Sequence, residues 1–356
     1  QAMREDKEAA LREYKNIFTS EGGDGQIIKR ATIIKNSVPR PPKLRSDDIN
    51  SKWALLFDSA RAKDNSVVLC AEYINDPVVG WRMKIQNVVN LLNVMKKHKT
   101  PMTTPNQIKE VKKLLLAYNG EGVADYENIL GFWIDAGSGG AGVNISDFFW
   151  EDWEDDNGIM HRGMIDKEYS PEEVRLYPNA ILNKMRLIQP TKYKVEMFRA
   201  LIEMMDMNLI EWPMEYDNRG YITVMYDLNT KTGEKVPRYK EPTDKEVKSL
   251  EKSGIQIVRE QYNLDQDEEI ALKQIDAMKT ELVNIYRFKQ SSGGDRFDLP
   301  PGSKLNDDRA YVCAMAAYLL QSLRRDHLIN KKRTSSANML DQFKIRAPQN
   351  PNSLFN

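Results

Sequence analysis

Hydrophobic residues in the first half of the chain fall into short, nearly continuous runs, a pattern typical of strands buried on both faces of a sheet. Three such runs are joined by short links, and they predict an antiparallel meander over Trp53–Asp58, Ser66–Ile74 and Gly80–Leu91. A helical pattern follows over Thr104–Asn119, where apolar residues recur on one face. The next apolar run, Ile129–Asp135, predicts a fourth strand.

This order of elements indicates the fold class. Three antiparallel strands, a helix and a further strand are the order of the ribonuclease H-like fold, an α/β fold. Its mixed central sheet has three antiparallel strands, then parallel strands, and is flanked by helices. In that core the first and fourth strands are neighbours. We therefore expect the acids that end them, Asp58 and Asp135, to lie side by side.

The second half of the chain is predicted to alternate helices with short strands. Apolar periodicity predicts helices over Pro178–Gln189, Val195–Met207 and Glu268–Arg287. A further helical run begins near Asp308. The run Leu209–Pro213 is predicted to be the final strand of the core.

We expect three parts along the chain. Residues 1–50 hold a helical start, a glycine-rich break, a strand-like run at Gln26–Ile34 and an extended Pro39–Lys43 link that marks the domain border. Residues 51–328 would form the main domain. Residues 329–356 are basic and polar, then rich in Pro and Asn, and would form a mobile tail.

Composition limits the classes of function. The chain has 356 residues with 52 basic and 52 acidic side chains, so a nucleic-acid surface has to be a local patch. No apolar run reaches transmembrane length, and no GxxxxGKS/T loop occurs, so an ATPase motor is not expected in this chain. Cys70 and Cys313 lie in apolar runs as expected for buried thiols, and the three histidines lack zinc-site spacing.

Carboxylate side chains are the remaining candidates for a functional site. Asp58 and Asp135 end apolar runs, Asp64 lies in the polar link, and Asp307 and Asp308 open the last helical run. Each could instead be an ordinary turn or helix-capping residue. A buried strand that ends in an acid is costly unless the acid is paired or binds a metal. A set of oxygen ligands suits magnesium or manganese.

Several stretches together resemble one known family. FDSARAKDNSVV at Phe57–Val68, WIDAGSGGAG at Trp133–Gly142 and LNDDRAYVCAMAAYLL at Leu305–Leu320 carry the resemblance. Further similarity lies in Tyr216–Tyr221 and Asp267–Arg287. The chain resembles the C-terminal nuclease domain of the large terminase subunit, the DNA-packaging motor protein of tailed phages and herpesviruses. The resemblance covers most of the chain.

The resemblance implies a ribonuclease H-like fold and a metal-dependent endonuclease. Such an enzyme cuts concatemeric double-stranded DNA by two-metal phosphodiester hydrolysis, at the initiation and termination of genome packaging. In this sequence Asp58 would bridge two magnesium or manganese ions, Asp135 would hold one ion and Asp308 the other. Asp64 and Asp307 would be outer or alternative ligands. The sequence leaves open which acid of the Asp307 and Asp308 pair faces the ions.

The implied partners are double-stranded DNA, the portal protein, the small terminase subunit and the protein's own ATPase domain, whose end residues 8–33 resemble. The setting would be the host cell cytoplasm, transiently at the procapsid portal, without a membrane. DNA phosphates would meet a group of basic residues that could equally be solvated surface: Lys184, Arg186, Lys192, Lys194 and Arg309.

Two other functions stay open from the sequence. One is a different ribonuclease H-like nuclease of the resolvase or integrase type. The other is a non-catalytic docking module for the portal or the small terminase subunit.

Overall fold

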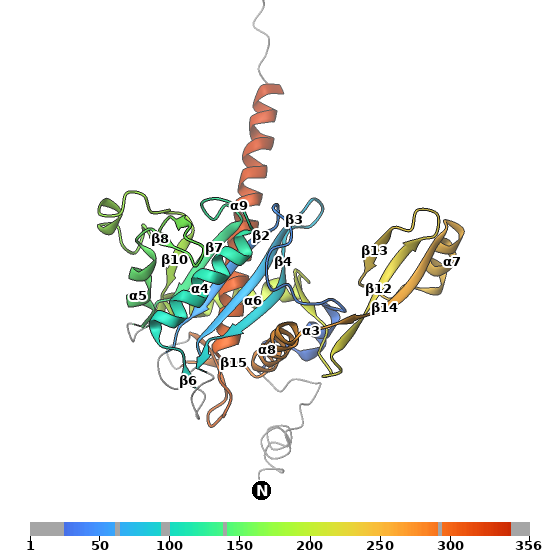
Figure 1. The fold of residues 1–356 in the computed structure, drawn as a ribbon, viewed down its shortest axis with the longest axis horizontal. Helices are drawn as coiled ribbons and strands as arrows, with labels where there is room; N and C mark the ends of the chain where they lie inside the picture. Colours follow the sequence, from blue (N-terminus) through green and yellow to red (C-terminus); the bar gives the residue numbers. More distant parts are fainter. Residues whose placement is uncertain (1–24, 61–64, 94–99, 138–140, 291–293, 343–356) are drawn as a thin grey trace, which may run out of the picture.

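The computed structural model of the chain describes residues 25–60, 65–93, 100–137, 141–290 and 294–342. Its centre is a seven-stranded sheet in the order β1-β11-β4-β3-β2-β7-β10 (Figure 1). These strands are β1 (Ser37–Val38), β2 (Lys52–Asp58), β3 (Val67–Asp76), β4 (Gly80–Asn90), β7 (Ile129–Asp135), β10 (Met185–Ile188) and β11 (Ile210–Pro213). β2, β3 and β4 are antiparallel, while β7 and β10 continue parallel to β2. This is the predicted ribonuclease H-like order.

Helices cover both faces of the sheet because its central strands are apolar on both sides. In β2, Ala54 and Leu56 enter one hydrophobic core, whereas Leu55 and Phe57 enter the other, and all four are fully buried. Each large side chain buried in this way contributes about 1.5–3 kcal/mol. The core that contains Leu55 and Phe57 is covered by helix α4 (Thr104–Asn119). The core that contains Ala54 and Leu56 is covered by three helices, α6 (Pro190–Asp206), α8 (Gln266–Leu282) and α9 (Asp308–Gln342).

The pairing of β2 with β7 decides where the candidate acids lie. Phe57 is opposite Ile134 in a parallel register, so the residues that follow, Asp58 and Asp135, reach the same edge of the sheet. Neighbouring strands are about 4.8 Å apart, which is within the reach of two carboxylate side chains.

Most of the predicted elements of the first half are confirmed, and two predictions of the second half need correction. The meander, the helix Thr104–Asn119 and the strand that ends at Asp135 are all present. The helix predicted over Pro178–Gln189 is wrong, because this segment contains β10, which pairs with β7. The predicted final strand, Leu209–Pro213, contains β11, but β11 pairs with β4 on the other side of the sheet. Four-residue strands are too short to show a period, so pairing with neighbours decides their structure.

Residues 26–50 pack against the main fold, which corrects the border predicted at residue 50. Helix α3 (Arg30–Lys35) overlaps the strand predicted at Gln26–Ile34, and β1 extends the sheet by pairing with β11. The Arg40 side chain is buried and donates hydrogen bonds to Glu211 at 2.8 Å and Gln86 at 2.6 Å. These charge-assisted bonds tie the segment to the edge of the sheet.

A small three-stranded sheet projects from the body of the molecule (Figure 1). It consists of β12 (Tyr221–Asn229), β13 (Lys235–Arg238) and β14 (Ile255–Asn263), with α7 (Asp244–Lys252) packed beside β14. The remaining elements are short: β5 (Leu92–Asn93), β6 (Thr100–Pro101), α5 (Ala141–Ser146), η1 (Asp147–Phe149), β8 (Trp153–Glu154), β9 (Met160–His161), η2 (Glu173–Arg175), β15 (Tyr286–Lys289) and β16 (Asp295–Asp298).

Helix α9 is longer than the sequence predicts. It continues to Gln342 and projects beyond the body, so the first part of the predicted tail 329–356 is helical (Figure 1). Residues 343–356 lie outside the described part of the chain. Within the described residues, no helix has both the length and the apolar character needed to span a membrane.

A buried ion pair fixes the start of α9. The Glu281 carboxylate in the last turn of α8 accepts hydrogen bonds from the backbone N–H groups of Arg309 (2.8 Å) and Ala310 (3.1 Å), and from the Arg309 guanidinium (2.6 Å). Gln274 accepts two further bonds from that guanidinium. A carboxylate at a helix N-terminus satisfies free N–H groups and the helix dipole. Arg309 is only 9% exposed, which corrects its predicted role in DNA binding.

Arg309→Ala should lower the free energy of unfolding by about 3–5 kcal/mol, because it leaves a buried carboxylate without its cation. Chemical denaturation at pH 7.5 measures this loss. Arg325→Ala is the matched control, since Arg325 is exposed on the same helix. Its effect should stay within about 0.5 kcal/mol. Equal losses in the two variants would contradict the anchoring role of Arg309.

Candidate active site

Two carboxylates meet at the ends of the two central strands. Asp58 is the last residue of β2, Asp135 is the last residue of β7, and both are half-buried. The parallel register that ends at Phe57 and Ile134 brings them together. The two carboxyl groups are within hydrogen-bonding reach of each other. The structure thus places these acids side by side, as the order of elements predicts.

The Asp135 carboxylate lies where negative charge is unfavourable. Burial raises its pKa to about 6, and the opposing effects of the Gly137 N–H and the Lys194 ammonium only partly offset this. Its Oδ1 atom is buried and has no hydrogen-bond partner within the described residues. A buried anionic oxygen without a donor is stabilised by a bound cation, and hard divalent cations prefer such oxygen ligands.

The two acids at the start of α9 have different neighbours. Asp307 Oδ2 lies 3.4 Å from the Lys194 ammonium, which also acts on Asp135, so these three charges form one group. Asp308 Oδ2 accepts hydrogen bonds from the backbone N–H and the side-chain amide of Asn65, both at 3.0 Å. Asp308 thereby ties α9 to the residues that precede β3, while Asp307 shares its lysine with Asp135.

The fifth predicted ligand, Asp64, lies outside the described residues. Among the residues that are described, no group of three or more His, Cys, Asp and Glu side chains is arranged to hold a metal ion. The acids form two adjoining groups at one edge of the sheet, with Asp58 beside Asp135 and Asp307 beside Asp308. A bound ion would have to draw these two groups of acids closer together, or a further ligand would have to complete its coordination.

Three of the predicted DNA-contacting residues lie near this edge. Lys192 and Lys194 are in the first turns of α6, which starts just after β10 ends opposite Asp135. Lys192 is exposed, whereas Lys194 is half-buried against Asp307. Arg186 on β10 lies over the ring of Trp133, 5.3 Å from its centroid. Lys192 is therefore the exposed cation of this group.

Lys184, a fourth residue predicted to contact DNA phosphates, is not part of that group. It precedes β10, so its backbone lies at the opposite end of the strands from Asp135, about 13 Å away along β7. Its ammonium donates to the backbone oxygen of Ile129 at 2.6 Å. Burial and, less strongly, the nearby Lys52 lower the pKa of Lys184. Its contacts are those of a lysine that supports the fold.

Sequence analysis missed two neighbours of the acids. Tyr311 follows Asp307 by one helical turn, and its backbone N–H donates to the Asp307 carbonyl at 2.8 Å. Burial is the main cause of its raised pKa, and the charges of Asp135, Asp58 and Asp307 add to it. The spacing of four residues from Asp307 was the available signal. Asn65, in contrast, lies in a polar link where no pattern distinguishes it.

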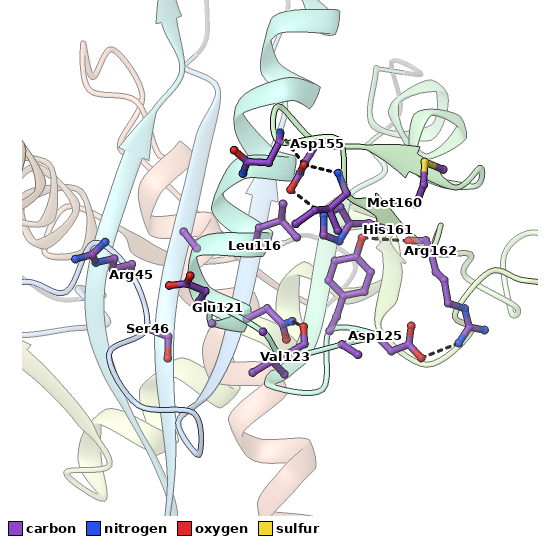
Figure 2. Close-up of a pocket in the computed structure, with 18 of the residues that line it drawn as sticks. Arg45, Ser46, Leu116, Glu121, Val123, Asp125, Asp155, Met160, His161 and Arg162 are labelled. Carbon is purple, nitrogen blue, oxygen red and sulfur yellow. Dashed lines mark hydrogen bonds and ion pairs between the residues drawn. The ribbon is translucent and has the colours of Figure 1, made fainter.

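A separate cavity of about 870 Å³ lies at the other end of β7 (Figure 2). Its lining residues come from the segments 45–47, 116–126 and 155–162. Asp155 pairs with His161 at 3.1 Å, and Arg162 pairs with Asp125 at 2.9 Å across its wall. None of the predicted site residues lines this cavity. It is therefore distinct from the carboxylate groups at the ends of β2 and β7.

Among known proteins, the chain is similar to solved structures. No family model and no curated protein matches the chain. The large terminase nuclease from thermophilic phage G20c is 11% identical, with 82% of this chain and 97% of that chain covered and a TM-score of 0.41. The chain is similar to phage terminase nucleases.

Two further terminase structures are similar at lower scores. The Thermus phage P74-26 large terminase nuclease domain is 10% identical, covering 80% of this chain and 90% of that chain, with a TM-score of 0.36. The large terminase of thermophilic bacteriophage D6E in complex with ADP is 12% identical, covering 61% of this chain and 41% of that chain, with a TM-score of 0.30. Likenesses of this size do not carry an activity over to the present chain.

Asp135→Asn should stabilise the metal-free protein at neutral pH. The pKa of Asp135 in the folded protein lies above that of an ordinary aspartate, about 3.9. Its contribution to stability is therefore present below pH 4 and is lost as the pH rises through about 6. Denaturation in EDTA should show a gain on the order of 2 kcal/mol at pH 7.5. The gain should be much smaller at pH 4.5, and the same gain at both pH values would contradict the account.

Proposed function

We propose that this chain is a divalent-metal-dependent endodeoxyribonuclease that hydrolyses phosphodiester bonds of double-stranded DNA. The observation that carries the proposal is the pairing of Asp58 with Asp135 at the ends of two buried parallel strands. One oxygen of Asp135 is buried without a partner among the described residues, and the start of an acid-bearing helix lies beside it. A fold that only had to be stable would gain nothing from this concentration of carboxylates.

The donor set fits magnesium or manganese. Asp58 and Asp135 offer carboxylate oxygens on neighbouring strands, and Asp307 adds another beside Lys194. Asp308 and Asp64 are the further candidate ligands, so that two ions could be held between strands and helix. The chemistry supplied by bound ions of this kind is activation of water and stabilisation of the leaving oxygen. All of these ligands are hard oxygen donors, which excludes a preference for soft metals.

The chain's own residues prepare this group in two ways. Lys194 offsets part of the negative charge of Asp135 and Asp307, so that the acids can stay close in the absence of metal. The Glu281 and Arg309 pair fixes the start of α9 and hence the position of Asp307. Positions fixed by strands and by an anchored helix are more precise than positions on loops.

The biological setting that we propose is genome packaging by a tailed phage. The nuclease would cut concatemeric DNA at the start and end of packaging, in the host cell cytoplasm and at the procapsid portal. It would act with the portal protein, the small terminase subunit and an ATPase domain. The support for this setting is the resemblance of Phe57–Val68, Trp133–Gly142 and Leu305–Leu320 to large terminases.

Asp58→Asn and Asp135→Asn should each slow nicking of supercoiled plasmid by more than about 100-fold in magnesium or manganese. Loss of a residue that only orients a metal ligand already lowers metal affinity or activity by about 10–100-fold, so loss of a ligand itself should cost more. Asp156→Asn is the control, because Asp156 is an exposed acid paired with Lys109 on another part of the surface. Its rate should equal that of the wild type.

The outcome also separates the alternative functions. Nicking at the same rate in the wild type and both variants would show that these acids are not catalytic. A preference for branched DNA or for an RNA–DNA hybrid over plasmid would favour another ribonuclease H-like nuclease. Binding to the portal without any metal-dependent cutting would favour a docking module.

Lys192→Ala should weaken binding of duplex DNA in EDTA equally across sequences. It should also reduce the slope of log affinity against log salt by about 1, as expected for the loss of one phosphate contact. Lys184→Ala is the matched control, since Lys184 lies at the far end of the strands and bonds to the backbone. A salt dependence that changes in the Lys184 variant and not in the Lys192 variant would contradict this assignment.

A further inference from the structure

Asn65 lies in the polar link between β2 and β3 and contacts the start of α9. Its backbone N–H and its side-chain amide both donate to Oδ2 of Asp308, each at 3.0 Å. Two donors on one carboxylate oxygen hold that carboxylate in one orientation, because turning it would break both bonds. Asn65 therefore determines how Asp308 is presented at the edge of the sheet.

Helix capping is the ordinary explanation for an acid at the start of a helix. In α9 the N–H groups of Arg309 and Ala310 donate instead to the carboxylate of Glu281, at 2.8 and 3.1 Å. Glu281 also anchors the helix through its ion pair with Arg309. Asp308 is not needed for either task, so what its contact with Asn65 adds is a defined orientation of the Asp308 carboxylate.

The side chain of Asn65 is itself oriented by Asn90. Asn90 is the last residue of β4 and lies opposite Val67 of β3, which in turn lies opposite Asp58 of β2. The amide nitrogen of Asn90 donates to Oδ1 of Asn65 at 3.1 Å. The oxygen of an Asn side chain accepts and its nitrogen donates, so a donor at Oδ1 leaves the NH₂ group directed at Asp308. The hydrogen bonds thus run from β4 through the link to α9.

Gln107 holds the link at both of its ends. It is 1% exposed and lies on α4, where a buried amide is costly unless its polar atoms are bonded. Its nitrogen donates to the backbone oxygen of Ala60 at 2.9 Å, and its oxygen accepts from the Ser66 hydroxyl at 2.7 Å. Ser66 directly follows Asn65 in the chain. Asn65 is therefore carried by a segment whose two ends are fixed to the same buried side chain.

We propose that Asn65 is a positioning residue that orients the Asp308 carboxylate toward the ion site at the ends of β2 and β7. Asn90 sets the direction of the Asn65 amide. The inference rests on the proposed function, and it makes Asp308 the ligand that the helix contributes. Residues that hydrogen-bond a ligating carboxylate contribute to metal affinity without touching the ion.

The test is manganese binding by the full chain without DNA, measured by calorimetry below the melting temperature of each variant. Asn65→Leu removes the side-chain donor with little change of volume. It should weaken manganese affinity by about 10-fold or more, as losses of orienting partners do. A residue that only stabilised the fold would leave the affinity of the folded protein unchanged. In plasmid nicking, the manganese concentration for half-maximal rate should rise, and the rate should recover at saturating manganese.

A double-mutant cycle shows whether Asn65 acts through Asp308. Asp308→Asn alone should lower manganese affinity by more than Asn65→Leu does, because it changes the ligand itself. Adding Asn65→Leu to Asp308→Asn should cause less than about a 2-fold further loss, because the carboxylate that Asn65 orients is already absent.

Two further variants keep the result interpretable. Asn90→Leu leaves the Asn65 side chain in place and should also weaken manganese affinity, which provides a second test if Asn65→Leu folds poorly. Asn36→Leu is the matched control. The Asn36 amide donates to Oδ1 of Asn208 at 3.2 Å beside β1, at the edge of the sheet farthest from β10. Asn36→Leu should leave manganese affinity unchanged.

Wild-type manganese affinity in both Asn65→Leu and Asn90→Leu would overturn the positioning role. Wild-type affinity in Asp308→Asn, or additive losses in the double variant, would overturn it as well. Asp58→Asn separates these failures from a failure of the proposed function, since loss of manganese binding in Asp58→Asn would leave the nuclease standing without a part for Asn65. Manganese binding that is absent in the wild type would overturn both proposals.

Discussion

Burial of two adjacent carboxyl groups at the ends of neighbouring strands is the constraint on which the candidate site depends. Parallel pairing of β2 with β7 brings Asp58 and Asp135 to one edge of the sheet, and neither can move away without breaking a buried ladder. Burial disfavours the charged form of Asp135 by removing water from its carboxylate, which raises its pKa. The surrounding structure compensates for part of this burial cost, first through the Gly137 N–H and then through the Lys194 ammonium. The remaining charge is available to a cation.

The third element of the site depends on contacts made far along the chain. Helices α8 and α9 pack in the same hydrophobic core against the sheet, and the two helices are joined by Glu281 and Arg309. This buried pair orders the first turn of α9, where Asp307 and Asp308 lie. Asn65 then joins Asp308 to the start of β3. The acids are thus held in place by the pairing of β2 with β7, by the Glu281–Arg309 ion pair and by the contact between Asn65 and Asp308.

The sequence predicts well those features that have a strong local pattern. The runs that end at Asp58 and Asp135 are long and apolar, so both strands and the acids at their ends could be found without the structure. β10 could not, because four residues do not distinguish a strand from a helix, and its partner β7 decides the outcome. Arg309 was assigned to DNA because its neighbours are acidic and its burial depends on Glu281, which no local pattern connects to it.

Asp307 contacts Lys194, whereas Asp308 contacts Asn65, and this difference also depends on the tertiary structure. Helical spacing places both residues at the start of one helix, but it does not show which neighbouring element each side chain meets. Tyr311 was within reach of sequence reasoning, since it follows Asp307 by four residues. Only the structure shows that its hydroxyl is buried without a protein partner among the described residues.

The most direct measurement is the anomalous difference density of a crystal soaked in manganese. The account predicts strong density between the carboxylates of Asp58 and Asp135, with Asp307 or Asp308 completing the coordination. Manganese density found only elsewhere, for example in the cavity lined by Asp155 and His161, would contradict the central claim.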